Sequence, residues 1–228
     1  MGCAAVALAQ STTNVDEIIA KNLAAKGGAD KLRAVTSVRT TGRAKSARGT
    51  ATLTMWTRRP TSMRQEIVTD GRTTVTGYDG TTLWAINPVL GPQAREVKGP
   101  AADRAREEAS DFDSALLDYK DKGNAVELVP AEAGGPIHLR VTKKNGKIQD
   151  IYLNSTTYLE ERVTSEVEQG LKKAIVKTEL SNYKQVDGMM VPFTIRQIVN
   201  GQVEGEITYE RVQFNLPLSD DLFKMPSK

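Results

Sequence analysis

The stretch from His138 to Asn215 constrains the fold more than any other part of the sequence, because it alternates strand-forming runs with tight-turn dipeptides. Asn145-Gly146 and Asn200-Gly201 each tolerate the positive φ angles of the two-residue turns that join twisted antiparallel strands. Asp187-Gly188 marks a third turn, and the runs between the turns are rich in Val, Ile, Thr and Tyr without helical periodicity. The stretch predicts five or six consecutive antiparallel strands, which form a meander.

The sequence before His138 adds further strands and some helical material. Asn14 and Glu17 have the spacing of a helix cap and its capping box, and Gly27-Gly28 ends that helix before a short helical piece over 29–35. A second helical pattern runs over 101–118. Further strands are predicted over 37–44, 50–57, 62–69, 73–78, 82–86 and 126–129.

Together these segments predict a mainly β (α+β) protein with one domain over 10–228. A single antiparallel sheet of about ten or eleven strands cannot stay flat, because its twist accumulates until the sheet curls. We expect a half-open barrel whose concave face is covered by the N-terminal helix and the inserted helix. These helices offer few large apolar residues, so we expect an unfilled apolar cleft on that face.

The first nine residues have the pattern of the end of an export signal. Ala4 to Ala9 form an apolar run that ends in Ala-x-Ala before Gln10, so residues 1–9 are interpreted as a truncated signal-peptide remnant, and the mature protein is expected outside the cytoplasm. Alternatively, Gly2-Cys3 is the remnant of a lipoprotein signal in which Cys3 is acylated. Cys3 is the single cysteine, so the chain has no disulfide framework.

Positive charge is concentrated in the first third of the chain. From Lys31 to Arg72 the sequence carries ten Lys and Arg residues, opposed there by Glu66 and Asp70 alone. One interpretation is a solvated outer face, and the alternative is a patch for peripheral contact with anionic lipid headgroups or an acidic partner. The net charge of the whole chain is only +3, which does not favour nucleic acid as a partner.

Residues that usually carry catalysis are sparse. His138 is the one histidine, and no other histidine or usable cysteine completes a metal site, so we interpret it as structural. No Gly-x-Ser-x-Gly elbow occurs, and the neighbours Glu160 and Glu161 point to opposite faces of a strand. The sequence therefore predicts neither an enzyme, a cofactor nor a metal. The one catalytic arrangement that it leaves open is a pair of carboxylates that come from separate strands and meet in the fold.

Several short motifs follow one another along the chain. They are Tyr78 to Trp84, Asp150 to Asn154 followed by Tyr158 to Glu160, Val186 to Pro192, and Asp221 to Pro226. Their order and spacing resemble the LolA/LolB-like periplasmic lipoprotein-carrier superfamily, which includes the outer membrane lipoprotein-sorting proteins. The resemblance covers most of the chain and implies an antiparallel half-barrel whose apolar cavity takes the acyl chains of lipoproteins or related lipids. It also implies an inner-membrane transporter and an outer-membrane receptor as transfer partners.

Two functional hypotheses follow. The first is a periplasmic carrier, expected to be a monomer, that holds a lipid or the acyl chains of a lipoprotein. The second is a non-transporting cell-envelope sensor or scaffold that binds a protein partner through the same fold. The resemblance also implies a lid-closing arginine, for which Arg43 and Arg64 are candidates.

The residues predicted to line the apolar cavity are large apolar side chains from the expected strands and the inserted helix. The alternative for each of them is a place in a closed core. They are Leu53, Met55, Met63, Ile67, Trp84, Ile86, Phe112, Leu116, Ile151 and Leu153.

Overall fold

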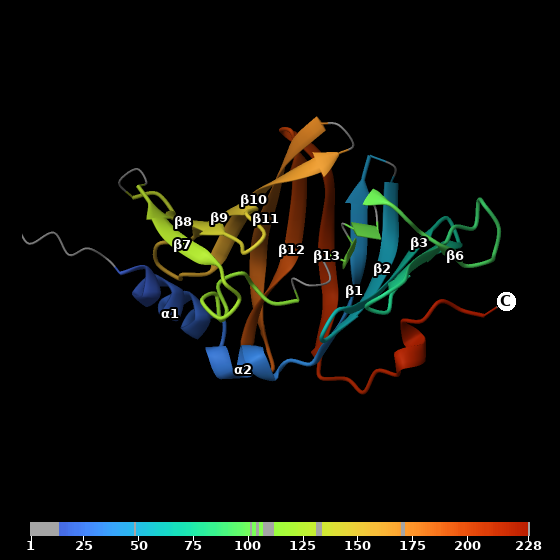
Figure 1. The fold of residues 1–228 in the computed structure, drawn as a ribbon, viewed down its shortest axis with the longest axis horizontal. Helices are drawn as coiled ribbons and strands as arrows, with labels where there is room; N and C mark the ends of the chain where they lie inside the picture. The colour runs from blue at the N-terminus through green and yellow to red at the C-terminus, as the bar shows by residue number, and fades with distance from the viewer. Residues whose placement is uncertain are drawn as a thin grey trace, which may run out of the picture.

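The computed structural model describes residues 14–47, 49–100, 102–103, 105–106, 112–130, 134–169 and 172–227. The predicted signal remnant, residues 1–9, lies outside these residues. The described part of the chain forms one antiparallel sheet of 13 strands with two α-helices and a short 3-10 helix (Figure 1). This confirms the mainly β fold built on a single curved sheet, with two or three strands more than the sequence predicted.

The helices are α1 (Val15–Ala25) and α2 (Ala29–Ala34), and the 3-10 helix is η1 (Asp220–Leu222). The strands before the long crossover are β1 (Ser37–Ser46), β2 (Gly49–Arg58), β3 (Ser62–Thr69), β4 (Arg72–Tyr78), β5 (Leu83–Ile86) and β6 (Arg95–Glu96). The strands after it are β7 (Ala125–Val129), β8 (Ile137–Thr142), β9 (Ile148–Leu153), β10 (Glu160–Gln169), β11 (Lys172–Val186), β12 (Met189–Val199) and β13 (Gln202–Phe214).

The sheet consists of two meanders joined at their first and last strands. Its strand order is β6-β5-β4-β3-β2-β1-β13-β12-β11-β10-β9-β8-β7. The chain builds one half outward from β1 to the edge strand β6, and the other half inward from the edge strand β7 to β13, which pairs with β1. The crossover, residues 97–124, therefore carries the chain from one edge of the sheet to the other.

The sequence predicted most of these elements, with two differences. Within the described residues, β6 was missed because a strand of two residues leaves no periodic pattern. The helix expected over 101–118 is wrong in its second part, because residues 115–123 form turns. There the successive residues Leu116 and Leu117 are both buried, and Asp118 has a φ of 51°. Two successive inward side chains followed by a left-handed residue do not fit one helical face.

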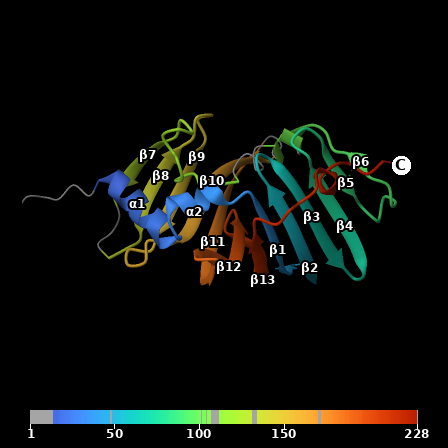
Figure 2. The ribbon, with the colours of Figure 1, turned by 90° about the horizontal axis from the view of Figure 1, so that it is seen from below.

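α1 begins where the sequence predicted. The Asn14 side chain accepts a hydrogen bond from the Asp16 amide at 3.0 Å. Glu17 forms an ion pair with Lys21 at 2.7 Å instead of closing the capping box. The buried face of α1 packs on β8 and β9, and Figure 2 shows α1 and α2 over this end of the sheet.

The inner face of the sheet, the face toward α1, is densely filled at one end. A core of seven buried aliphatic side chains lies between α1, the crossover and strands β8 and β9. Its members are Ile18, Ile19, Leu116, Leu139, Val141, Ile151 and Leu153. We call this set the α1 core.

The outer face is covered at the other end, by the C-terminal segment after β13. The Trp84 indole donates to the Phe223 carbonyl at 2.7 Å, and both side chains are fully buried. Figure 2 shows this segment running across β2 to β5. The sheet is thus covered on opposite faces at its two ends, which leaves the inner face of β1 to β4 to be covered by α2 and the crossover alone.

Candidate functional site

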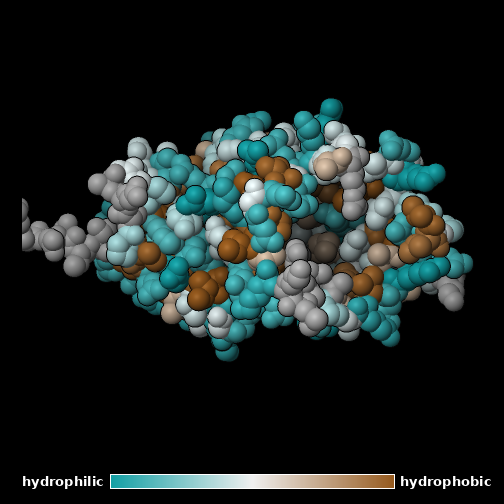
Figure 3. All heavy atoms as spheres, turned by 90° about the horizontal axis from the view of Figure 1, so that it is seen from above, coloured by the Kyte–Doolittle hydropathy of each residue, from teal (hydrophilic) through white to brown (hydrophobic). Residues whose placement is uncertain are grey.

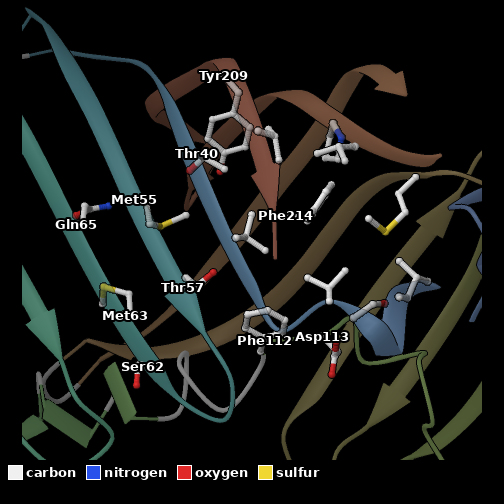
Figure 4. A pocket seen from close by; sticks show the side chains of 18 of the residues that line it. Thr40, Met55, Thr57, Ser62, Met63, Gln65, Phe112, Asp113, Tyr209 and Phe214 are labelled. Carbon is white, nitrogen blue, oxygen red and sulfur yellow. The ribbon is translucent and has the colours of Figure 1, made fainter. Parts of the chain in front are cut away.

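A cavity of about 800 Å³ lies on this inner face. One wall comes from β1 to β4 with β13, and the opposite wall comes from α2, the start of β12 and the crossover. Figure 4 shows Met55, Met63 and Gln65 on the strand wall, with Phe112 and Asp113 on the crossover. Figure 3 shows apolar side chains gathered around a hollow near the middle of one face of the molecule.

Most of the residues that line the cavity are apolar. They are Leu32, Val35, Val38, Met55, Met63, Leu83, Ala105, Phe112, Leu117, Met189, Met190, Val191, Pro192, Val212 and Phe214. Four of the six methionines in the chain are among them. Methionine is unbranched and polarisable, so it fits its shape to different apolar partners. The lining can therefore adapt to apolar ligands of different shapes.

Two cross-strand rows make the strand wall, because paired residues on adjacent antiparallel strands point to the same face. One row, which we call the polar row, consists of Val212, Thr40, Met55, Gln65 and Thr76. The next row consists of Phe214, Val38, Thr57, Met63 and Tyr78. The wall therefore combines apolar side chains with uncharged polar ones, and neither row contains a charge.

A partly buried ion pair borders the cavity at the end of α1. Lys26 Nζ lies 2.9 Å from Glu160 Oε1, with the two side chains 15% and 12% exposed. Ser114 Oγ donates to the same carboxylate oxygen at 3.2 Å, and the Tyr183 hydroxyl donates to the Glu160 carbonyl at 2.7 Å. Burial, followed by the negative charge of Glu160, raises the pKa of Tyr183, so it stays neutral. The charges at this end are thus paired with each other.

Arg59 ties the crossover to the rest of the cavity wall. Its guanidinium donates to both carboxylate oxygens of Asp113, at 2.7 and 2.6 Å, and to the Val35 carbonyl at 2.6 Å. It also stacks over the Phe112 ring, 4.7 Å from the ring centre. Because Val35, Phe112 and Asp113 all line the cavity, this arginine holds two walls together.

The predicted cavity residues divide into distinct groups. Met55, Met63 and Phe112 line the cavity. Leu116, Ile151 and Leu153 belong to the α1 core, and Ile151 also borders a smaller cavity of about 220 Å³. Leu53 is buried on β2, and its register partner Ile67 is half-buried on β3; neither is part of the cavity lining.

Trp84 and Ile86 lie on the outer face, which corrects their expected place on the concave side. They pair with Gly77 and Val75 of β4, whereas Thr76 between those two residues lines the cavity. Strand periodicity separates residues into two faces, but it does not say which face is the inner one.

Neither predicted lid arginine lies at the cavity. Arg43 pairs with Glu210 and is 72% exposed. Arg64 pairs with Glu66 at 2.7 Å and also contacts the C-terminal segment on the outer face. Arg59 holds the crossover instead, and its only signal in the sequence is its place directly before Pro60 at the end of β2.

Several cavity residues were missed by the sequence analysis. Met189 and Met190 stand at the start of β12, and Lys26 lies just after α1. Tyr209 lines the cavity from β13. Two adjacent methionines are the one signal that could have drawn attention to this end of β12, because methionine is common at adaptable apolar surfaces.

In the described part of the chain, five of the ten Lys and Arg residues of the basic run form ion pairs. Arg33 pairs with Asp118 at 2.6 Å, and Arg58 pairs with Asp220 at 2.7 Å. With the pairs of Arg43, Arg59 and Arg64 given above, these contacts connect the run to the crossover, β3, β13 and the C-terminal segment.

His138 belongs to a half-buried network on β8 and β9. Its Nε2 lies 2.9 Å from Asp150 Oδ1, and its ring stacks on Tyr152 at 4.2 Å between centroids. Burial by itself raises the pKa of Asp150, but hydrogen bonds from Arg140 and His138 outweigh it and hold the pKa below its ordinary value. Among the described residues, no three His, Cys, Asp or Glu side chains form a group that could hold a metal ion. None of the helices in the described part of the chain is long and apolar enough to cross a membrane.

No protein-family model and no curated protein sequence matches the chain. Solved structures do match it. A DUF1329 family protein from Desulfovibrio piger has a TM-score of 0.60 at 15% identity, over 92% of this chain and 97% of that chain. An outer membrane lipoprotein-sorting protein domain from Vibrio parahaemolyticus has a TM-score of 0.57 at 15% identity, over 91% and 94%. A LolA superfamily protein from Nitrosomonas europaea has a TM-score of 0.57 at 12% identity, over 89% and 96%. The chain therefore has a LolA-like fold.

Proposed function

We propose that this protein is a periplasmic carrier that binds a lipid, or the acyl chains of a lipoprotein, in the cavity between the strand wall and the crossover. The observation that carries the proposal is the mainly apolar space of about 800 Å³. Ligand pockets in proteins usually have about 300–1,000 Å³ and predominantly apolar walls. The LolA-like fold supports the same conclusion, because one structural neighbour is described as a lipoprotein-sorting protein domain.

The lining suits a long hydrocarbon chain. Burying one methylene is favourable by about 0.8 kcal/mol, so ten methylenes contribute on the order of 8 kcal/mol before the loss of chain freedom is subtracted. Met55, Met63 and Phe112 are the predicted residues that would contact the chain. The two charged residues of the lining, Lys26 and Asp113, are held in ion pairs, so apolar area drives binding in this proposal.

Phe112 and Leu117 of the crossover line the cavity, so in this proposal a movement of the crossover relative to the strand wall controls entry and release. The contacts between Arg59 and Asp113 resist that movement. In the carrier proposal, an inner-membrane transporter loads the protein, an outer-membrane receptor unloads it, and the protein acts as a monomer without enzymatic activity.

Native mass spectrometry of the exported protein, purified without detergent, tests this function. We expect a stoichiometric adduct that organic extraction identifies as an acylated molecule. Met55→Trp replaces a flexible side chain of the lining by a bulkier, rigid ring and should weaken the adduct, whereas Met225→Trp, outside the lining, should retain it. A protein that stays free of adduct after incubation with lipids and an acylated peptide would contradict the carrier function. That outcome would favour a cell-envelope sensor or scaffold, to be pursued by crosslinking of a protein partner.

A further inference from the structure

Uncharged polar side chains interrupt the strand wall of the cavity. In the polar row, Thr40, Gln65 and Thr76 alternate with apolar residues on β1, β3 and β4. The α1 core at the other end of the sheet is aliphatic, and the polar residue of α1 that is buried beside it, Asn22, donates to the Tyr158 carbonyl at 2.8 Å. The polar row, in contrast, faces a cavity instead of packed protein. A container for plain hydrocarbon gains nothing from polar side chains in its wall.

Thr40 is the most telling member of the row. Its side chain is 5% exposed, and its Oγ1 forms no well-aligned hydrogen bond among the described residues, although a weak one to the Tyr209 side chain acts on that residue's pKa. A buried hydroxyl that is only weakly bonded has lost its bonds to water and regained little, which is unfavourable. Figure 4 shows Tyr209 beside it. Burial raises the pKa of Tyr209, with the Thr40 hydroxyl acting in the opposite direction, so both groups are neutral hydroxyls.

Gln65 extends this polar character toward β3. Its carboxamide offers both donors and an acceptor, and no hydrogen bond within the described part of the chain engages it. Neighbouring strands lie about 4.8 Å apart, so Thr40 on β1 and Gln65 on β3 are about 10 Å apart across the wall. A chain that crosses the strands can therefore meet polar groups at two points.

We propose that the polar row recognises a neutral oxygen carried within the hydrocarbon part of the ligand, either a hydroxyl group or an ester oxygen on the acyl chain. Thr40 and Gln65, together with Tyr209, would then determine specificity among acyl ligands. These three residues do not suit a charged group of a ligand, because all three are neutral. The charged residues of the lining are already held in ion pairs. The inference rests on the proposed carrier function and names the ligand class for the same cavity.

Competition against a fluorescent fatty acid tests the inference on the full chain. The competitors are hexadecanoic acid, its monohydroxylated isomers and their acetyl esters. We expect at least one oxygenated isomer to bind about three- to tenfold tighter than hexadecanoic acid, the gain from one hydrogen bond. A preference for free hydroxyls over acetyl esters identifies a hydroxyl ligand, and the reverse identifies an ester.

Substitutions that keep the shape of a side chain but remove its polar group test which residues cause the preference for an oxygenated isomer. Thr40→Val and Gln65→Leu should each abolish this preference, which is measured within each variant as the ratio of its affinities for the oxygenated isomer and for hexadecanoic acid. Thr41→Val should keep it, because Thr41 is the neighbour that points to the outer face of β1. Gln65 is half-buried, so its variant serves as the test if Thr40→Val does not fold.

The outcomes separate this inference from the proposed function. Binding of hexadecanoic acid with no preference for any oxygenated isomer would overturn the inference and leave the carrier function standing. A preference that survives in both variants would also overturn it. Failure of every acyl competitor to bind would overturn the carrier function itself.

Discussion

Weakening the contact between Arg59 and the crossover should accelerate ligand release. Arg59→Lys is the sharpest perturbation, because it keeps the positive charge but removes the planar fork that makes two parallel hydrogen bonds to Asp113. It also removes the bond to the Val35 carbonyl and the stacking on Phe112. The closed arrangement of the cavity loses these contacts, whereas the strand wall is untouched.

The solvent exposure of the Arg59–Asp113 pair determines how strongly the substitution should weaken the contact. A hydrogen bond to a charged group contributes about 1.5–3 kcal/mol, and an exposed ion pair contributes about 0–1 kcal/mol. The side chains of Arg59 and Asp113 are 32% and 14% exposed, which places the pair between these cases. We expect the closed state to be weakened by about 1–2 kcal/mol, and release to become about 5- to 30-fold faster.

Stopped-flow transfer of a bound fluorescent fatty acid to acceptor vesicles measures this rate. Arg43→Lys and Arg64→Lys are the matched controls, since these arginines form their ion pairs away from the cavity. Both should release ligand at the wild-type rate. A wild-type rate for folded Arg59→Lys, or equal acceleration in all three variants, would refute the assignment of Arg59 to the crossover contact.

Three further predictions concern binding and stability. Shortening an acyl probe by two methylenes should weaken binding about 15-fold, because each methylene contributes about 0.8 kcal/mol; an equilibrium titration with no dependence on length would contradict apolar binding. Because hydrogen bonds lower the pKa of Asp150 in the folded protein, its carboxylate stabilises the fold above the unfolded pKa of about 3.9, and this stability is lost as the pH falls through the folded pKa. Urea unfolding should therefore show a stability difference between wild type and Asp150→Asn at pH 7 that closes in acid, and a difference independent of pH would count against the network. Gly77→Ala should lower the free energy of unfolding by about 1–3 kcal/mol, because its Cβ would stand 2.3 Å from the Trp84 ring; an unchanged melting temperature would show that the ring moves aside freely.

The strands could be predicted from the sequence because their signals are local. Asn200 and Gly201 have φ angles of 48° and 83°, and Asp187 and Gly188 have 50° and 78°, as the turn dipeptides required. Asn14 likewise identifies the start of α1 through the residues that immediately follow it. Each of these features depends on a few neighbours in the chain.

The cavity could not be predicted in the same way, because it depends on contacts between distant segments. Val38 lies opposite Phe214, and no local pattern indicates that the first and last strands pair. Ile151 and Met55 are both inward apolar residues on strands, yet α1 covers the first and leaves the second facing open space. Their difference comes from the position of a helix and not from their own sequence.

Helix length explains why the cavity exists at all. Thirteen strands spaced by about 4.8 Å span about 58 Å, whereas the 11 residues of α1 and the 6 of α2 are together only about 26 Å long. α1 cannot simply continue toward β1, because Gly27 follows it with a φ of 116°, and a Cβ there would stand 2.5 Å from the Gly188 carbonyl oxygen. The chain must turn at this contact, so the remaining inner face is covered by the short α2 and by the crossover. A cover that consists of a six-residue helix and the crossover, and that Arg59 fastens, can move relative to the sheet without unfolding α1, which is the mechanical property that a carrier of acyl chains needs.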